Sequence, residues 1–262
     1  MKHNEVVTTS PGVFDKWLDA LHARHVLPYR PPEFTRALRA LSARYVERRN
    51  ELAERSALDS AGKRSAFAAF YAPLHYLTVR EIVRSLPADA RMASHIVDLG
   101  CGTGVGAAAW QDAQARPVHV TGIDQSQWAL AEARWNWREL HVTGRAERGD
   151  LVAALPAPVP DRASDRPALL LAWAVNELPR DAQGRLLPRL LEHARGGGHV
   201  LIIEPLARGA APWWDRWVAE FAPAGAQSDE WKFRLDLPPM LKELSARAGF
   251  RRDYLGARSI WI

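Results

Sequence analysis

The sequence predicts an α/β fold with a mostly parallel sheet and helices on both faces. Three observations lead to this prediction. The segment 94–106 reads as a buried strand, a glycine-rich turn and the start of a helix. A second strand-like segment, 117–123, ends at Asp124, and a third, 168–173, is apolar throughout, as in strands buried on both faces of a parallel sheet. Helix-like segments separate the three, and such alternation is typical of a doubly wound sheet.

Composition places the chain among ordinary globular proteins. Of its 262 residues, 47% are hydrophobic and 25% are charged, which suits one α/β domain with an appendage. The polar start, 1–10, lacks the apolar segment of a signal peptide. The longest apolar run, 168–175, is far shorter than the ~20 residues of a membrane helix. With Cys101 as the single cysteine, we expect a cytoplasmic protein without a disulfide partner, a membrane partner or a metal.

The first 91 residues are predicted to be helical and to precede the sheet as an extension. Apolar residues recur at helical spacing over 11–25, 33–58 and 65–86, and the last segment is predicted to form one or two helices, with the division near Pro73. This region holds 15 Lys and Arg against 10 Asp and Glu, which accounts for the whole net charge of +5. Basic helices favour a polyanion such as RNA, and a solvated helix face explains the charge equally well.

The turn after the first strand organises the rest of the chain. Asp98 lies near the end of the strand, and Gly100, Gly102 and Gly104 follow at alternate positions. Glycines let the backbone turn sharply and approach a ligand, and the helix start presents free N–H groups to an anion. The stretch 102–107 also satisfies the dinucleotide fingerprint G-x-G-x-x-G/A, but its first glycine then comes two residues late.

Further elements continue the alternation after the turn. Additional strands are expected over 145–149 and 199–204, and the predicted helices are 107–113, 127–140, 181–194 and 238–250.

The C-terminal part departs from the alternation. The segment 208–238 gathers six large aromatic residues, and we expect an insertion there whose aromatics either cover a substrate pocket or form its own core. The segments 251–255 and 258–262 flank Gly256-Ala257, which predicts a terminal β-hairpin.

Read from Asp98, the glycine turn resembles the nucleotide-binding signature of class I S-adenosylmethionine-dependent methyltransferases. The resemblance covers 71–262 and implies a Rossmann-like sheet of seven strands with a C-terminal antiparallel hairpin. It also implies that residues 1–91 form an N-terminal helical extension or lid and that residues 92–262 form the S-adenosylmethionine-binding domain. The implied cofactor is S-adenosyl-L-methionine, with S-adenosyl-L-homocysteine as the product.

The cofactor contacts follow from this resemblance and from spacing. Asp124 is placed to accept hydrogen bonds from both ribose hydroxyls, because it lies 24 positions beyond Gly100 at the end of the second strand. The resemblance implies that Asp150 accepts from the adenine amino group beside the backbone of Leu151. The remaining predicted contacts are Asp98, Gly100, Cys101, Gly102, Thr103, Gly104, Gln125 and Trp173.

The segment 173–177 should border the transferable methyl group, because ligands lie beyond the carboxyl ends of the strands. Methyl transfer from a sulfonium chiefly requires alignment and exclusion of water, and a base is needed only when the acceptor loses a proton. Glu177, His75 and Tyr71 are the candidate bases, and Asn176 is placed to orient an acceptor. Each of these residues also suits a packing or capping role.

The sequence leaves two classes of acceptor open, small molecules and RNA. The segment 174–179 is not the Asp/Asn-Pro-Pro-Tyr type of exocyclic-amine methyltransferases, and cytosine-C5 chemistry needs a cysteine outside the cofactor turn. The stretches Tyr71-Ala-Pro, Asn176-Glu177-Leu178 and Ile203-Glu204-Pro205 are similar to the ribosomal small-subunit methyltransferase-like family, whose usual C-terminal cysteine cluster is missing here.

Three functions therefore remain as predictions. The first is an active methyltransferase. The second is a catalytically inactive, cofactor-binding RNA or ribosome assembly factor. The third is a nicotinamide-dependent oxidoreductase. The oligomeric state is not predicted.

Overall fold

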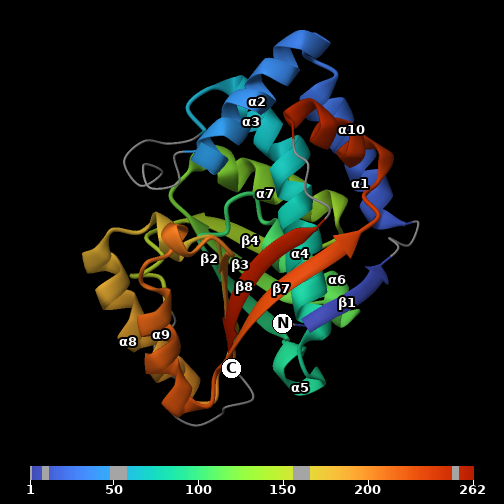
Figure 1. The fold of residues 1–262 in the computed structure, drawn as a ribbon. Coiled ribbons are helices and arrows are strands. Elements are labelled where there is room, and N and C mark those ends of the chain that lie inside the picture. The colour runs from blue at the N-terminus through green and yellow to red at the C-terminus, as the bar shows by residue number, and fades with distance from the viewer. Residues whose placement is uncertain (1, 8–11, 48–57, 156–165, 250–253) are drawn as a thin grey trace.

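A single sheet runs through the molecule (Figure 1). The computed structural model describes residues 2–7, 12–47, 58–155, 166–249 and 254–262. Its strands, in chain order, are β1 (Lys2–Val7), β2 (His95–Leu99), β3 (His119–Asp124), β4 (Thr143–Arg148), β5 (Ala168–Ala172), β6 (Val200–Pro205), β7 (Gln227–Leu235) and β8 (Leu255–Trp261).

The strand order confirms the predicted fold class. Across the sheet the order is β1-β7-β8-β6-β5-β2-β3-β4. Strands β2 to β6 pair in parallel with their neighbours, and β8 is antiparallel to both β6 and β7. The order reverses between β2 and β5, so the loops after these strands diverge and leave room for a ligand at the carboxyl ends.

The sheet has one strand more than the seven that were predicted. Strand β1 pairs in parallel with β7, with Lys2 opposite Trp231 and Asn4 opposite Phe233. The prediction missed it because the segment has no regular alternation of apolar and polar residues. An edge strand is stabilised by backbone pairing on one side only, so a short polar segment is able to supply one.

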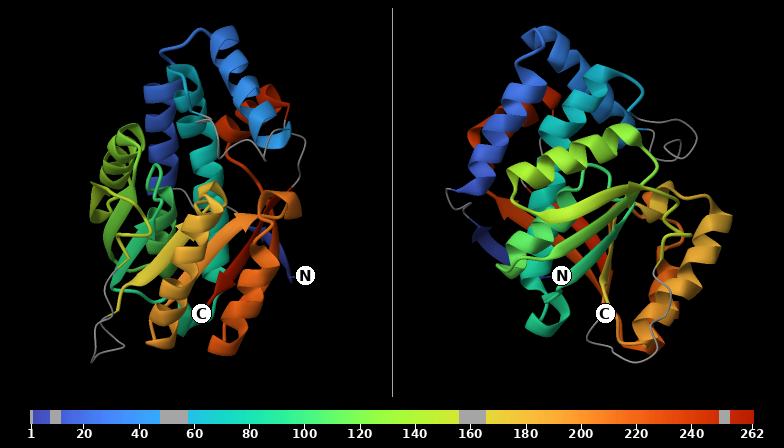
Figure 2. Two further views of the ribbon diagram at one scale, coloured as in Figure 1. Left: turned by 90° about the vertical axis from the view of Figure 1, so that its left-hand side faces the viewer. Right: turned by 180° about the vertical axis from the view of Figure 1, so that it is seen from behind.

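Helices cover both faces of the sheet (Figure 2). They are α1 (Val13–Leu21), α2 (Pro31–Glu47), α3 (Ala61–Ala66), α4 (Ala72–Ser85), α5 (Ala88–Arg91), α6 (Val105–Gln114), α7 (Gln127–Glu139), α8 (Arg180–Arg195), α9 (Trp214–Phe221) and α10 (Pro239–Ala248). One apolar core joins α1, α2, α4, α6 and α7 to one face, and a second core joins α8 and α9 to the other. Among the described residues, no helix combines the length and apolar character needed to span a membrane.

After strand β1, the N-terminal region forms helices in the part that the structure describes, and residues 48–57 lie outside that part. Of the one or two helices predicted over 65–86, the structure shows one continuous helical run, because α3 leads through a π-helical turn, Phe67–Tyr71, directly into α4. Pro73 lies just after the π-helical turn, and a helix departs from regular α geometry at a proline because that residue has no N–H to donate.

The predicted terminal hairpin is assigned to the wrong residues. The antiparallel partners are β7 and β8, with α10 between them, and Gly256 and Ala257 lie inside β8 rather than in a turn. Gly256 is explained by close packing, because a Cβ there would lie 2.5 Å from the Leu206 Cδ1 atom. Residues 250–253 lie outside the described part.

The aromatic segment 208–238 supplies α9 and β7. All six of its large aromatic side chains are buried in the two cores. They therefore hold these elements on the sheet and offer no exposed ring to a ligand. They are Trp213, Trp214, Trp217, Phe221, Trp231 and Phe233.

Candidate active site

Two glycines fix the shape of the turn between β2 and α6. Gly100 has φ +76°, and a Cβ there would lie 2.7 Å from the Ala174 Cβ atom. Gly104 has φ +75° and precedes α6, and a Cβ there would lie 2.6 Å from the Trp137 indole nitrogen. Only glycine fits both positions. A Cβ on Gly102, by contrast, would meet no atom within 4 Å, so the turn is packed at both ends and open in the middle.

Asp98 lies beneath this turn on β2. Its side chain is buried, and its Oδ2 atom accepts a 3.2 Å hydrogen bond from the N–H of Ala107 in the first turn of α6. Burial raises the pKa of Asp98 to about 7 against the lowering effect of that bond, and the charge of Asp124 raises it further. Asp98 thus ties the strand to the helix that follows the turn.

Asp124 connects the end of β3 to the glycine turn. Its Oδ2 atom accepts a 2.9 Å hydrogen bond from the N–H of Gly102, and its Oδ1 atom accepts a 2.8 Å bond from the N–H of Ser126. A carboxylate oxygen has two lone pairs, so both oxygens keep the capacity to accept from hydroxyl groups of a ligand. The carboxylate lies beside the open middle of the turn.

Two side chains of α7 hold the carbonyl groups of the turn, and the sequence analysis missed both. Asn136 donates from Nδ2 to the Thr103 carbonyl at 2.9 Å, and Trp137 donates from Nε1 to the Gly104 carbonyl at 2.8 Å. Both side chains are buried. The available signal was an asparagine on the apolar face of a predicted helix, but nothing local indicates its partner.

Cys101 and Thr103, two predicted contacts, have buried side chains. The Cys101 Sγ atom lies 2.9 Å from the position of a Cβ on Gly122 of β3. Burial, with the negative charges of Asp98 and Asp124, raises the pKa of the Cys101 thiol above its usual range. Neither residue therefore offers an exposed side chain at the turn.

The other predicted cofactor contacts lie on neighbouring loops. Asp150 is exposed after β4, and its Oδ1 atom accepts hydrogen bonds of 2.9 and 3.0 Å from the N–H groups of Val152 and Ala153. Leu151 is half-buried and faces the glycine turn, because its Cδ2 atom lies 3.5 Å from the position of a Cβ on Gly100. Gln125 is exposed beside Asp124.

Trp173 follows β5 in a strained backbone conformation. Its φ of +56° costs a bulky residue about 1–3 kcal/mol, and such strain is concentrated at functional sites. Its N–H donates a 2.8 Å hydrogen bond to the Ile203 carbonyl of β6. Its ring stacks on the ring of His75 from α4, with centroids 3.9 Å apart and planes inclined by 11°. This contact joins the N-terminal helices to the carboxyl end of the sheet.

The candidate bases His75 and Tyr71 lie in different surroundings. Burial lowers the pKa of His75 to about 4, so the ring is neutral at pH 7 and is a weak base. The Tyr71 hydroxyl donates a 3.0 Å hydrogen bond to Ser42 Oγ on α2, within the N-terminal core. The structure therefore brings His75 to Trp173 and directs the Tyr71 hydroxyl elsewhere.

Asn176 and Glu177 lie on a 3₁₀ turn, Val175–Glu177, and Glu204 of β6 supports this turn. Glu204 is fully buried, and its Oε1 atom accepts a 3.1 Å hydrogen bond from the N–H of Asn176. Burial raises the pKa of Glu204 to about 8. Among the described residues, neither Glu204 Oε2 nor Asn176 Oδ1 has a hydrogen-bond partner, although both atoms are buried.

Glu177 lies at the exposed end of the same 3₁₀ turn. The residue is exposed, but enough protein surrounds its carboxyl group that desolvation raises its pKa to about 7, and the charge of Asp124 adds to the rise. Asp124 ends β3 and Glu177 follows β5, and both strands pair in parallel with β2, so the two carboxyl groups lie at the same end of the sheet. Asp124, Trp173, Asn176 and Glu177 are thus brought together.

The strand order, the glycine turn and the acid that ends β3 define the Rossmann-like fold of methyltransferases. Residues 96–198 match a protein family described as the methyltransferase domain. This part of the chain is a class I S-adenosylmethionine-dependent methyltransferase domain. No curated protein matches the chain in sequence.

Solved structures are similar to this chain at low sequence identity. A protein from Nostoc punctiforme, provisionally described as an O-methyltransferase, is 13% identical, with a TM-score of 0.50, over 88% of this chain and 70% of that one. An S-adenosylmethionine-dependent methyltransferase from Geobacter sulfurreducens, solved with S-adenosyl-L-homocysteine, is 21% identical, with a TM-score of 0.40, over 72% of this chain and 90% of that one. At 13% identity, the likeness to the Nostoc punctiforme protein extends to the fold alone.

Proposed function

We propose that the protein transfers a methyl group from S-adenosylmethionine to an acceptor bound beside Glu177. The observation that carries the proposal is the open middle of the glycine turn. Gly102 has φ +51° and free space where a side chain would be, and the Asp124 carboxylate lies next to it. A nucleoside with an acidic tail requires such an arrangement, with backbone N–H groups for the tail and a carboxylate for the ribose.

Each cofactor contact has a role under this proposal. Asp124 accepts hydrogen bonds from the ribose hydroxyls, and the half-buried Leu151 packs near the adenine. Asp150 uses Oδ1 to cap its own loop, which leaves Oδ2 for the adenine amino group. Trp173 borders the reactive end.

The chemistry needs little more than placement. When bound, S-adenosylmethionine supplies a methyl group already activated by a positively charged sulfur. Asn176 orients the acceptor, and Glu177 removes its proton where one must leave; a pKa near 7 suits a base at neutral pH. The stacked rings of His75 and Trp173 exclude water from this end of the sheet. Tyr71 has no role in the proposal, because its hydroxyl is bonded to Ser42.

Small molecules and RNA both remain as acceptors. One surface bears on the choice. Arg36 and Arg39 of α2 and Arg247 of α10 line a shallow hollow together with Pro31 and Thr35. Phosphate groups of RNA suit such a surface, and a small acceptor makes no use of it.

We predict that Asp124→Ala weakens binding of S-adenosyl-L-homocysteine by about 1–3 kcal/mol, because charge-assisted hydrogen bonds to the ribose are lost. Isothermal titration calorimetry measures this. The control is Asp181→Ala, which removes an exposed carboxylate paired with Arg185 on α8. Equal affinity of Asp124→Ala and the unmodified protein rejects the ribose role.

Incubation with radiolabelled cofactor and a fractionated cell extract tests methyl transfer and identifies the acceptor class. Label in RNA, protein or small molecules distinguishes the acceptors. Cofactor binding without label in any fraction favours the inactive assembly factor. Competition by NAD, in place of S-adenosyl-L-homocysteine, favours the oxidoreductase.

A further inference from the structure

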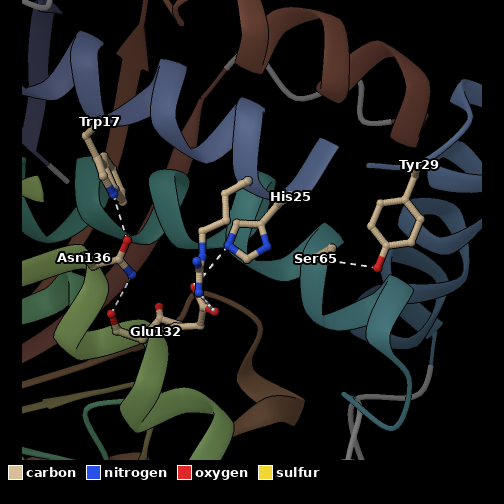
Figure 3. A network of polar contacts seen from close by, with 8 residues as sticks. Trp17, His25, Tyr29, Ser65, Glu132 and Asn136 are labelled. Carbon is tan, nitrogen blue, oxygen red and sulfur yellow. Dashed lines mark hydrogen bonds and ion pairs between the residues drawn. The ribbon is translucent and has the colours of Figure 1, made fainter. Parts of the chain in front are cut away.

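A chain of hydrogen bonds leads from the N-terminal helices to the glycine turn between β2 and α6, called the cofactor turn from here on (Figure 3). The Trp17 indole nitrogen of α1 donates to Asn136 Oδ1 of α7 at 2.8 Å. The same amide group donates from Nδ2 to the Thr103 carbonyl at 2.9 Å. Residues that are 119 positions apart in the sequence are therefore connected, and the connection ends in the turn that forms the proposed cofactor site.

The orientation of the Asn136 amide depends on Trp17. An indole N–H is a donor only, so the amide must direct its oxygen to Trp17 and its nitrogen to the Thr103 carbonyl. The reverse orientation would place two donors together at one end and two acceptors at the other. Trp17 is fully buried and Asn136 is 1% exposed, so water cannot readily replace either partner.

Both ends of the Thr103–Gly104 peptide are held. Its carbonyl accepts from Asn136, and its N–H, on Gly104, donates a 2.7 Å hydrogen bond to the Cys101 carbonyl. Because this peptide plane is held in one orientation, the N–H groups of the turn point in a fixed direction. Loss of the Asn136 bond removes one of the two hydrogen bonds that hold this peptide and leaves only the bond from the Gly104 N–H.

Other polar links from the N-terminal region stop short of the turn. Arg24 and His25 each contact the buried Glu132 carboxylate on α7 at 3.0 Å, and the hydroxyl groups of Tyr29 and Ser65 lie 3.1 Å apart (Figure 3). These contacts anchor the N-terminal helices. None of them touches a residue of the cofactor turn.

We propose that Trp17 is a positioning residue for the cofactor turn and acts through Asn136. The N-terminal helix α1 is then part of the cofactor site, although it lies outside the region that matches the family. The inference rests on the proposed function in that it takes this turn as the place where S-adenosylmethionine binds.

Trp17→Phe tests the proposal, because it removes the indole donor and keeps an aromatic ring. The matched control is Trp231→Phe. Trp231 is also almost fully buried and donates a 2.8 Å hydrogen bond, but its partner is Ser259 Oγ in the sheet. Calorimetry should show S-adenosyl-L-homocysteine bound about 3- to 10-fold more weakly by Trp17→Phe, the loss expected for one hydrogen bond. Trp231→Phe should bind within about twofold of the unmodified protein, whatever its loss of thermal stability.

A double-mutant cycle tests the route through Asn136. Asn136→Ala alone should weaken binding, and adding Trp17→Phe should then change the affinity by less than about twofold, because residues in one network are not additive. Full additivity overturns the proposal. So does an unchanged affinity of Trp17→Phe, or equal weakening by the two tryptophan variants.

Hydrogen exchange gives a readout that needs no cofactor. In the free protein, Trp17→Phe should speed exchange of the amides at 102–104, and Trp231→Phe should not. Unchanged exchange at 102–104 overturns the proposal. If the unmodified protein binds no S-adenosyl-L-homocysteine, the proposed function fails, and the exchange experiment still decides whether Trp17 positions the turn.

Discussion

At the residue scale, three carboxyl groups near the carboxyl ends of the central strands lie in surroundings that favour the protonated form. Burial raises the pKa of Asp98 and Glu177 to about 7 and that of Glu204 to about 8. Only Glu177 among them is exposed. Asp98 and Glu204 are buried and bonded to backbone N–H groups, so they support the site while Glu177 is accessible to an acceptor.

We predict that Glu177→Gln slows methyl transfer at least ~100-fold if the acceptor loses a proton, because a positioned base contributes at least that factor. Cofactor affinity should hardly change. The rate for the unmodified protein should rise with pH through about 7 as Glu177 ionises and level off above that pH, and the variant should lack this rise. Initial rates against pH, with the labelled acceptor fraction, measure both effects.

Glu220→Gln, an exposed change on α9, is the control for that measurement. A normal rate for Glu177→Gln would remove Glu177 from the reaction and leave Asn176 and the cofactor to act without a base.

Sequence spacing was enough to locate Asp98, Asp124 and the glycines, because each belongs to a strand end or turn within one strand–helix–strand unit. Their contacts with a cofactor stay predictions. Spacing did not predict Asn136, Trp137 or Trp17. Each of these acts on a partner at least 33 residues away, and no local pattern indicates which side chains meet across a core. Tyr71 was placed among the candidate bases for the same reason, since its bond to Ser42 is also long-range.

At the element scale, prediction succeeded where apolar periodicity was strong. Strands β2, β3, β5 and β6 and helices α6 to α8 agree with their predicted segments to within a few residues. One element was missed and one residue was assigned to the wrong element, each for a physical reason. The polar strand β1 is held by backbone pairing at an edge, and Gly256 looks like a turn residue although it serves close packing against Leu206.

We predict that deletion of residues 2–7 leaves the affinity for S-adenosyl-L-homocysteine within about twofold. Strand β1 is five strand positions from β2, or about 24 Å at the usual spacing. The deletion exposes the edge of β7, and an unpaired edge promotes association. Calorimetry tests the first expectation, and light scattering at increasing protein concentration tests the second. A large loss of affinity would mean that the edge strand influences the cofactor turn.

At the scale of the whole molecule, the N-terminal helices are built into the structure. Helix α4 packs on α6, β7 and β8, and α1 packs on α7. Contacts from His75 to Trp173 and from Trp17 to Asn136 reach both sides of the proposed site. A lid that opens by moving all these helices would have to break a continuous apolar core.

We predict that Glu204 makes the stability of the molecule depend on pH. Its folded-state pKa, about 8, is above the unfolded value of roughly 4.3. The folded state therefore keeps a proton that the unfolded state releases, and the associated stability is full below the unfolded value and is lost as pH rises through about 8. Arg258 lowers the pKa and Glu177 raises it, but burial dominates.

Thermal unfolding of the unmodified protein and of Glu204→Gln between pH 5 and 8.5 measures this dependence. The variant is uncharged throughout, so the unmodified protein should lose stability relative to it as pH rises. If the thermal stabilities of the two proteins changed with pH in parallel, Glu204 would already be ionised in the folded protein at pH 5.

The position of Cys101 gives the molecule a built-in reporter. The lone thiol lies under the cofactor turn, 7% exposed, with a pKa raised by burial and by two nearby acids. Alkylating reagents react with the thiolate, so this sulfur reacts slowly while the turn is closed and faster when the turn opens. The rate of alkylation thus counts how often the turn opens, with no label to install and no second cysteine to remove.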